Sequence, residues 1–207
     1  MKIGIINYGV GNINSVFNTL SKVHDNVKIV ENSLDIKNYD KIVLPGTGSF
    51  YKCINILKKN NWFHEIEDFV LNKKKYILGI CLGMQLFSKN GYEGSDGLKS
   101  CGFNFIDGEV KSLVSQGCTL RVPLIGWNEI NLTKDSILMK NIENNSDVYF
   151  INSYCLIPNS KDVISATTSH DIEFVSAIEK DNIFGTQFHP EKSSFTGIQI
   201  LKNFVNA

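Results

Sequence analysis

The sequence predicts an α/β fold in a single domain, with a mostly parallel central sheet flanked by helices and with antiparallel strands added to it. Three observations support this prediction. Short apolar runs end near glycines, helical patterns separate them, and the second half has many short strand-like segments joined by turns. The 207 residues are 43% hydrophobic and 20% charged. These values suit a globular chain with one core, so we expect one domain over residues 1–207.

The first 90 residues alternate strands and helices. Apolar runs at 3–6, 42–44 and 76–78 are soon followed by glycine, which is typical of strands buried on both faces of a parallel sheet. Apolar residues at helical spacing fall at 16–23 and at 62–70 and predict two amphipathic helices. In such folds the functional loops lie beyond the carboxyl ends of the strands. We therefore expect the functional residues to follow these apolar runs.

The second half reads as short strands followed by one helix. Strand-like segments occur at 102–106, 126–132, 147–154, 162–167, 174–178 and 183–188, joined by Asn, Ser, Gly and Asp turns. The final helix carries Ile198, Leu201, Phe204 and Val205 at helical spacing. We expect these strands to extend the same sheet in antiparallel fashion.

Composition excludes several classes of function. Lys+Arg and Asp+Glu are 21 each, so the chain lacks the basic excess of nucleic-acid binders, and we expect no nucleic-acid partner. No apolar run reaches the roughly 20 residues of a membrane helix, and the N-terminus lacks a signal-peptide pattern. We therefore expect no membrane segment and a cytoplasmic location. Five cysteines without a C-x-x-C pair argue against a disulfide framework or a zinc site, and we expect neither metal nor cofactor.

The strongest motif is the pentad Gly79-Ile80-Cys81-Leu82-Gly83, between an apolar strand and the start of a helix. Small flanking residues permit the strained strand-to-helix turn, the nucleophile elbow, that presents a side chain at the edge of a sheet. A helix N-terminus also favours the thiolate form of cysteine. The alternative is one more buried, inert cysteine, which is our expectation for the other four: Cys53, Cys101, Cys118 and Cys155.

A second motif, His189-Pro190-Glu191, supplies what a thiolate nucleophile needs: a base and a group that orients it. In an extended segment, residues two apart point the same way, and Pro190 biases His189 toward the β region. Glu191 would then accept a hydrogen bond from one imidazole nitrogen while the other faces Cys81. Alone, the tripeptide is equally compatible with a surface histidine beside a solvated glutamate.

A third motif is the glycine-rich loop Gly46-Thr47-Gly48, at the end of a buried strand and before a helix. Acyl transfer builds a tetrahedral oxyanion, which free backbone N–H groups stabilise. A phosphate cradle or a plain tight turn is the alternative, but the Lys-Ser/Thr of a P-loop is missing.

Together the three segments resemble the class I (triad) glutamine amidotransferases, whose motifs are a P-G-x-G oxyanion strand, a G-x-C-x-G elbow and a terminal H-P-E, in this order. Within that class the chain is most similar to the glutaminase subunits of imidazole glycerol phosphate synthase. The residues that narrow the match are Asn7 to Asn12 with Ser15-Val16, Met84-Gln85, Gly126-Trp127-Asn128, and Tyr149-Phe150 leading to Ser153-Tyr154. The likeness spans the whole chain.

The resemblance implies a glutaminase with a Cys81, His189 and Glu191 triad. It implies that Gly46, Thr47 and Gly48, together with the elbow at Leu82, hold the oxyanion. Glutamine would be held by Gln85 and the backbone near Ser153 and Tyr154. It further implies a heterodimer with a (β/α)8-barrel cyclase that receives the ammonia, contacted by the loops around Asn12, Trp127 and Asn128.

Two positions depart from the family pattern: Leu124 and Asn152 stand where members usually carry histidine. Neither belongs to the triad, so the departures bear on the partner rather than on glutamine hydrolysis. The alternative partner is an enzyme that makes amidino groups on bacterial surface sugars, which paralogues of the subunit supply with ammonia. A cysteine peptidase or γ-glutamyl hydrolase and a non-catalytic binding module are the competing classes, and the presence of all three triad residues argues against the last.

Overall fold

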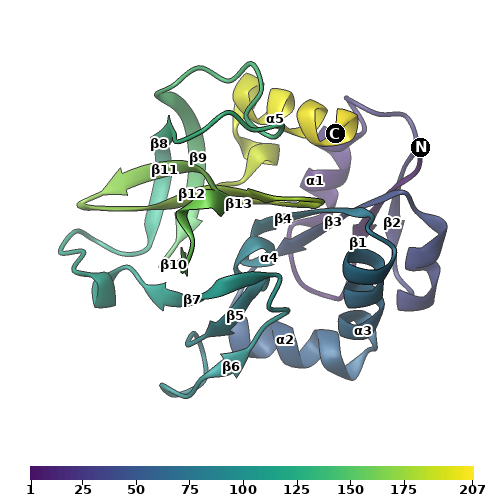
Figure 1. The fold of residues 1–207 in the computed structure, drawn as a ribbon, viewed down its shortest axis with the longest axis horizontal. Coiled ribbons are helices and arrows are strands. Elements are labelled where there is room, and N and C mark those ends of the chain that lie inside the picture. Colours follow the sequence, from purple (N-terminus) through teal and green to yellow (C-terminus); the bar gives the residue numbers. More distant parts are fainter.

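A computed structural model describes residues 1–207. Its main sheet has nine strands in the order β2-β1-β3-β4-β13-β12-β11-β8-β9 (Figure 1). The pairs among β1, β2, β3, β4 and β13 are parallel, and the pairs from β13 outward to β9 are antiparallel. The predicted combination of a parallel sheet with antiparallel additions is therefore confirmed. The strand bounds are β1 Ile3–Ile6, β2 Val27–Val30, β3 Lys41–Gly46, β4 Tyr76–Cys81, β8 Leu124–Leu132, β9 Ser146–Asn152, β11 Ile164–His170, β12 Ile172–Lys180 and β13 Ile183–Thr186.

Helices cover both faces of the main sheet. α1 and α5 lie on one side, and α2 and α3 lie on the other (Figure 1). None of the helices is long and apolar enough to cross a membrane. The helix bounds are α1 Ile13–Leu20, α2 Phe50–Lys59, α3 Trp62–Glu67, α4 Leu82–Gln85 and α5 Ser194–Asn206, and a π-helical turn, Asp68–Asn72, extends α3.

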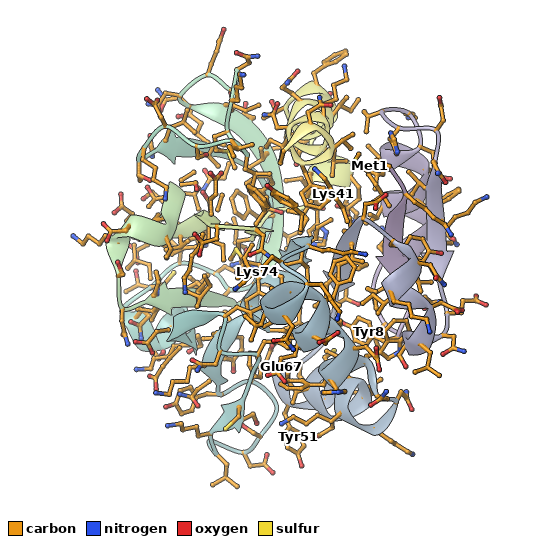
Figure 2. The ribbon with its side chains drawn as sticks, turned by 45° about the vertical axis from the view of Figure 1, so that its right-hand side comes forward. Met1, Tyr8, Lys41, Tyr51, Glu67 and Lys74 are labelled. Carbon is orange, nitrogen blue, oxygen red and sulfur yellow. The ribbon has the colours of Figure 1, made fainter.

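Buried Lys41 joins the third strand to the C-terminus. Its ammonium donates to the carbonyl oxygens of Phe204, Val205 and Ala207 at 2.9, 3.0 and 2.7 Å. These carbonyls belong to the last turn of α5 and the residue after it, where helix carbonyls lack their usual partners four residues on. In Figure 2, Lys41 lies beneath this helix end. Burial lowers the pKa of Lys41, but the three acceptors satisfy its three N–H groups. The last helix is thereby capped from the sheet that it covers.

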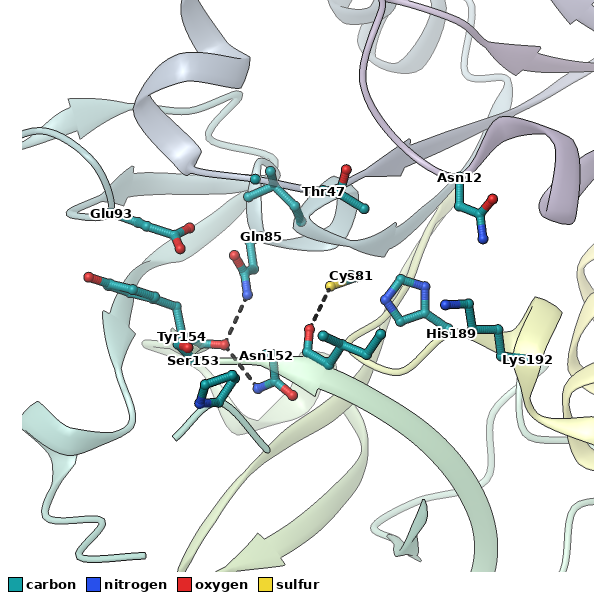
Figure 3. A pocket seen from close by; sticks show the side chains of 14 residues that line it. Asn12, Thr47, Cys81, Gln85, Glu93, Asn152, Ser153, Tyr154, His189 and Lys192 are labelled. Atoms are coloured by element: carbon teal, nitrogen blue, oxygen red, sulfur yellow. Dashed lines mark hydrogen bonds between the residues drawn. The ribbon is translucent and has the colours of Figure 1, made fainter. Parts of the chain in front are cut away.

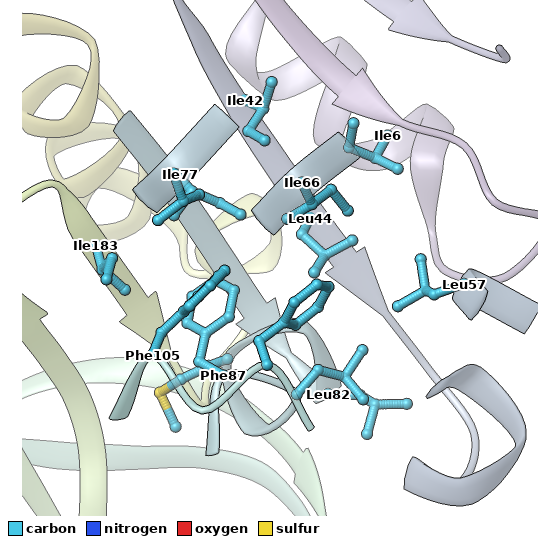
Figure 4. Packing of buried hydrophobic residues seen from close by; sticks show 14 of the residues in the cluster. Ile6, Ile42, Leu44, Leu57, Ile66, Ile77, Leu82, Phe87, Phe105 and Ile183 are labelled. Carbon is cyan, nitrogen blue, oxygen red and sulfur yellow. The ribbon is translucent and has the colours of Figure 1, made fainter. Parts of the chain in front are cut away.

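The alternation of side chains along the parallel strands creates two cores. Ile6, Ile42, Leu44 and Ile77 face α2 and α3, in the cluster of Figure 4. Their neighbours on the same strands face α1 and α5: Ile3, Ile5, Val43 and Leu78. Because both faces are buried, these strands read as continuous apolar runs, which explains why they could be predicted.

A second, smaller sheet corrects the expectation that all strands of the second half join the first sheet. Its order is β10-β7-β5-β6, and its strands are β5 Ser88–Gly91, β6 Ser100–Cys101, β7 Ile106–Ser112 and β10 Tyr154–Pro158. The predicted strand 147–154 is divided at Ser153, because β9 ends at Asn152 in one sheet and β10 begins at Tyr154 in the other. The chain thus passes from one sheet to the other at Ser153, near which the backbone is expected to hold glutamine.

The strand predicted at 102–106 is wrong except for its last residue. Residues 102–105 form a loop between β6 and β7. Phe103 and Phe105 stack with ring centroids 4.9 Å apart and are buried in the cluster of Figure 4. Their apolar character therefore reports burial in the core, not strand pairing.

Candidate active site

Cys81 occupies a strained turn between β4 and α4. Its backbone has φ 55° and ψ −112°, in a region that residues with a side chain rarely adopt. A Cβ at Gly83 would lie 1.8 Å from the carbonyl oxygen of Leu44, and one at Gly79 would lie 2.6 Å from the nitrogen of Met84. The two glycines of the pentad are therefore required by backbone packing, and the turn has the geometry of a nucleophile elbow.

The sulfur of Cys81 has polar neighbours from β9 and from the residue that follows β13. It is 3.7 Å from the carbonyl oxygen of Ile151, and the side-chain amide of Gln187 donates to it at 3.6 Å. The ring of His189 lines the same cavity. Polar groups therefore surround this sulfur, unlike that of a cysteine in a purely apolar core.

His189 and Glu191 make the contact that the motif predicted, on a different backbone. His189 Nδ1 donates to Glu191 Oε1 at 2.8 Å, and both side chains are buried. His189 is extended, as expected before proline, but Pro190–Lys192 form a 3₁₀ turn, so the expectation of an extended segment through Glu191 is wrong. Proline fits the first position of such a turn, and the turn brings the carboxylate back toward the ring.

The charge state of His189 follows from its partners. Burial lowers its pKa, but the hydrogen bonds with Cys81 and Glu191 raise it more, to about 10. At neutral pH the ring is therefore an imidazolium beside the sulfur. A group in this state can deliver a proton to a leaving group.

Backbone contacts hold His189 in place. Its N–H donates to the carbonyl oxygen of Tyr149 at 2.8 Å, and its carbonyl oxygen accepts from Ser193 Oγ at 2.6 Å. The same hydroxyl accepts from the Tyr149 N–H at 2.9 Å. The backbone N–H and carbonyl of His189 are thus both connected to Tyr149 of β9, the carbonyl through the Ser193 hydroxyl.

The glycine-rich loop lies directly beside the elbow. Gly46 is the cross-strand partner of Cys81, and a Cβ there would come within 2.8 Å of the Gly83 nitrogen. Gly48 has φ 89° and open space around its Cα, and Thr47 and Gly48 line the cavity in front of the sulfur. The loop therefore borders the cavity beside the sulfur, and its role in holding an oxyanion stays a prediction.

The cavity at this site has a volume of about 310 Å³ (Figure 3). It gathers nine predicted site residues: Asn12, Thr47, Gly48, Cys81, Leu82, Gln85, Ser153, Tyr154 and His189. Gly46 and Glu191 lie behind this lining, and Trp127 and Asn128 lie outside it. Asn12, expected at the partner face, is therefore nearer to the reacting atoms than predicted. Lining residues that sequence reasoning did not identify are Glu93, Pro123, Ile151 and Lys192.

Gln85 presents an acceptor to the cavity. Its Nε2 donates to the carbonyl oxygen of Tyr154 and to Gln187 Oε1, both at 2.9 Å, so both amide hydrogens are used. Its amide oxygen is turned toward Glu93 in Figure 3. Burial raises the pKa of the Glu93 carboxyl, which also accepts from the Phe50 N–H. This wall of the cavity therefore presents hydrogen-bond acceptors from two side chains.

The two departures from the family pattern are one structural feature. Leu124 and Asn152 are directly opposite each other on β8 and β9, and both are buried. Asn152 Nδ2 donates to the Tyr154 carbonyl oxygen at 3.1 Å, and its Oδ1 has no partner. Because they form a cross-strand pair at the cavity wall, the two substitutions affect the same place.

Two of the residues predicted to face the partner, Trp127 and Asn128, lie on β8. Trp127 is 52% exposed on β8, and Ile125, two residues before it on the same face, is 62% exposed. The amide of Asn128 donates to Thr168 Oγ1 and to the Ser169 carbonyl oxygen, and its contact with a partner stays a prediction. Ile125 was missed, although its period-two spacing from Trp127 is a signal for it.

The remaining titratable groups form no second centre of this kind. All five cysteines are free, and Cys101 is the exposed one. No three His, Cys, Asp or Glu side chains lie close enough together to hold a metal ion.

Comparisons with known proteins agree with this geometry. The model of the family "Glutamine amidotransferase class-I" matches residues 4–207. The chain is 42% identical to imidazole glycerol phosphate synthase subunit HisH of Pelagibacter ubique, over 100% of both chains, and 38% identical to the subunit of that name from Leptospira borgpetersenii, over 99% of both. The structure of PurLQS from Thermotoga maritima has the same fold, with a TM-score of 0.75 at 15% identity, over 99% of this chain and 97% of that one. The chain therefore belongs to the class-I glutamine amidotransferase family.

Proposed function

We propose that residues 1–207 form a glutaminase domain that hydrolyses glutamine to glutamate and ammonia and serves as the glutaminase subunit of an imidazole glycerol phosphate synthase in histidine biosynthesis. The observation that carries this proposal is the cavity itself, where the sulfur of Cys81 and the ring of His189 meet. Full-length identity of 42% and 38% to relatives named as that subunit supports the choice of pathway.

The cavity suits glutamine. The carboxamide would lie against Cys81, and the α-ammonium group would lie between the oxygens of Gln85 and Glu93 at the other end. Glu93 is the carboxylate among the lining residues, which gives the cavity one anionic end. A volume of about 310 Å³ leaves room for one small substrate rather than for an extended peptide.

The reaction follows from the charge states. The Cys81 thiolate attacks the carboxamide carbon, and the backbone N–H groups of Thr47, Gly48 and Leu82 stabilise the oxyanion. The C–N bond breaks as His189 donates its proton to the leaving nitrogen, which releases ammonia and leaves a γ-glutamyl thioester. Water then attacks the thioester while neutral His189 takes its proton. Glutamate departs, and the thiolate and imidazolium are restored.

The ammonia would pass to a (β/α)8-barrel cyclase docked over Trp127 and Ile125. An exposed tryptophan beside an exposed isoleucine suits a protein interface, where large aromatic side chains supply most of the binding energy. The cavity wall next to this face contains Pro123 and Asn152, so the reacting atoms lie close to the proposed partner.

The test is steady-state glutaminase turnover of the chain alone and with the same organism's cyclase and that cyclase's nucleotide ligand. We expect strong stimulation by the loaded cyclase, and we expect Cys81→Ala to lower turnover by at least about a thousandfold with an unchanged circular dichroism spectrum. A substantially active Cys81→Ala protein would overturn the mechanism. An active chain that the cyclase does not stimulate would overturn the pathway and favour the sugar-amidating partner.

A further inference from the structure

Gln187 lies behind the floor of the cavity and connects two parts of the site. It follows β13, its side chain is fully buried, and it is not among the residues that line the cavity. Its side-chain amide lies between Cys81 and Gln85, at 3.6 Å from Sγ and 2.9 Å from Gln85 Nε2. The mechanism above does not use it. A fully buried amide with partners of these two kinds calls for an explanation.

The orientation of both amides follows from one fixed acceptor. The carbonyl oxygen of Tyr154 can only accept, so the nitrogen of Gln85 must face it. The second hydrogen of that nitrogen then requires the oxygen of Gln187 on its other side. The nitrogen of Gln187 is consequently directed at the sulfur of Cys81. The chain of hydrogen bonds therefore runs in one direction, from the nucleophile to the far wall of the cavity.

We propose that Gln187 is a positioning residue that couples the nucleophile to substrate binding: its N–H stabilises the thiolate of Cys81, and its oxygen orients the amide of Gln85. The role of Gln85 rests on the proposed glutaminase function, whereas the contact with the sulfur does not.

Each contact has a chemical consequence. A hydrogen bond to a charged acceptor is stronger than one to a neutral acceptor, so the N–H of Gln187 favours the thiolate over the thiol. With Gln187 in place, the oxygen of Gln85 must point into the cavity, where it can accept from an ammonium group. Without it, the Tyr154 carbonyl alone holds the nitrogen of Gln85, so the amide loses one of the two bonds that fix its orientation.

Other groups also face the sulfur and define the background of the test. His189 lines the same cavity as the sulfur, and burial, with nearby Cys53 and Cys81, raises the pKa of the Tyr8 hydroxyl. Glu93 and Lys192 line the same cavity, and Glu191 acts through His189. All of these are unchanged in a Gln187 variant, so any difference in sulfur reactivity reports the amide alone.

The first measurement is the rate at which iodoacetamide alkylates Cys81, as a function of pH, in a Cys101→Ser background that removes the exposed thiol. Gln187→Met has a similar length without polar atoms. Losing a hydrogen bond to a charged group should slow alkylation at neutral pH by about tenfold to a hundredfold and move the profile to higher pH. An unchanged profile in folded Gln187→Met would overturn the contact with the sulfur.

The second measurement separates the two roles by glutaminase kinetics with the partner present. Gln187→Glu keeps an oxygen acceptor for Gln85 but replaces the N–H donor by a negative charge. We expect kcat to fall while KM stays within about threefold of wild type, whereas Gln187→Met should also raise KM by about tenfold. Equal KM values in the two variants would overturn the orientation of Gln85.

A matched control removes a buried amide elsewhere. Asn203 in α5 is 7% exposed, and its Nδ2 donates to the carbonyl oxygens of Leu138 and Lys140. Asn203→Leu should lower the melting temperature as much as Gln187→Met does while leaving the alkylation profile unchanged. If both variants slow alkylation equally, the effect is structural and the proposal fails. A wild type that is alkylated normally but never hydrolyses glutamine would instead refute the proposed function.

Discussion

The two halves of the active site are held by different means. On the side of Cys81, three glycines let main chain lie directly against main chain: Gly46 and Gly79 in parallel strands and Gly83 in α4. On the side of His189, the ring donates to Glu191 and its backbone carbonyl accepts from the Ser193 hydroxyl. Cys81 is thus positioned by the close backbone packing that glycine permits. His189 is positioned by hydrogen bonds with neighbouring side chains.

This difference predicts opposite sensitivities. The nucleophile side should not tolerate an added atom, because the elbow has no space and its backbone is already strained. The base side should tolerate no lost polar atom, because each buried donor or acceptor left unpaired costs free energy. Four substitutions test this contrast.

Gly83→Ala should have the largest effect. The new methyl group would lie 1.8 Å from the Leu44 carbonyl oxygen, so the elbow must open, and we expect the free energy of unfolding to drop by at least about 4 kcal/mol. Denaturant unfolding measures this. Gly117→Ala, which has φ 101° and open space, is the control and should lose only about 1 kcal/mol to strain. Equal losses would mean that strain, not backbone contact, makes the elbow intolerant.

Glu191→Gln tests the charge on the base side. The neutral amide no longer stabilises the imidazolium, and kcat should fall by about a hundredfold to ten-thousandfold. The folded-state pKa of His189, about 10, lies above its ordinary 6.5. Its contribution to stability is therefore fully present below pH 6.5 and is lost as the pH rises through 10.

The difference in unfolding free energy between wild type and Glu191→Gln should accordingly be largest near pH 6.5 and shrink toward pH 10. Chemical unfolding at several pH values in this window measures it. A difference that grows with pH would contradict the assignment of a charged His189.

Ser193→Ala should cost about 1–3 kcal/mol, because the Tyr149 N–H loses its partner and the His189 carbonyl keeps only the Lys192 N–H. Ser176→Ala is the matched control, since the Ser176 hydroxyl is fully buried with no hydrogen-bond partner. That control should be neutral or slightly stabilising, as thermal melts of the two variants would show. Similar losses would indicate that burial of the hydroxyl, not its bonds, matters.

Trp127→Ala should have the smallest effect on the chain alone. The side chain is half exposed and contacts the Tyr149 ring edge-on at 5.9 Å, so stability should change by less than about 1 kcal/mol. We expect unchanged unstimulated turnover and weaker stimulation by the cyclase. Full stimulation at the usual cyclase concentration would show that the partner docks elsewhere. The contrast between the two sides would then apply only to the buried site.

Local motifs were readable from the sequence because their geometry depends on neighbouring residues. A cysteine between Gly79 and Gly83 can adopt a turn that other flanking residues forbid, and Pro190 restricts His189 directly. Buried parallel strands were visible as apolar runs, whereas Phe103 and Phe105 misled because apolar residues of a core loop look the same. The backbone conformation between His189 and Glu191 could not be predicted either, because a turn and an extended strand can make the same contact.

By itself, then, the sequence determined the family, the parallel core and the motifs that carry Cys81, His189 and Glu191, because sterics over a few neighbouring residues specify each motif. Only the tertiary structure decided that Gln187 reaches Cys81, that Leu124 faces Asn152, and that Glu93 lines the cavity. Those contacts join segments far apart in the chain, and they depend on strand order and register. Residue spacing does not predict strand order or register, because both depend on how the two sheets and their covering helices pack together.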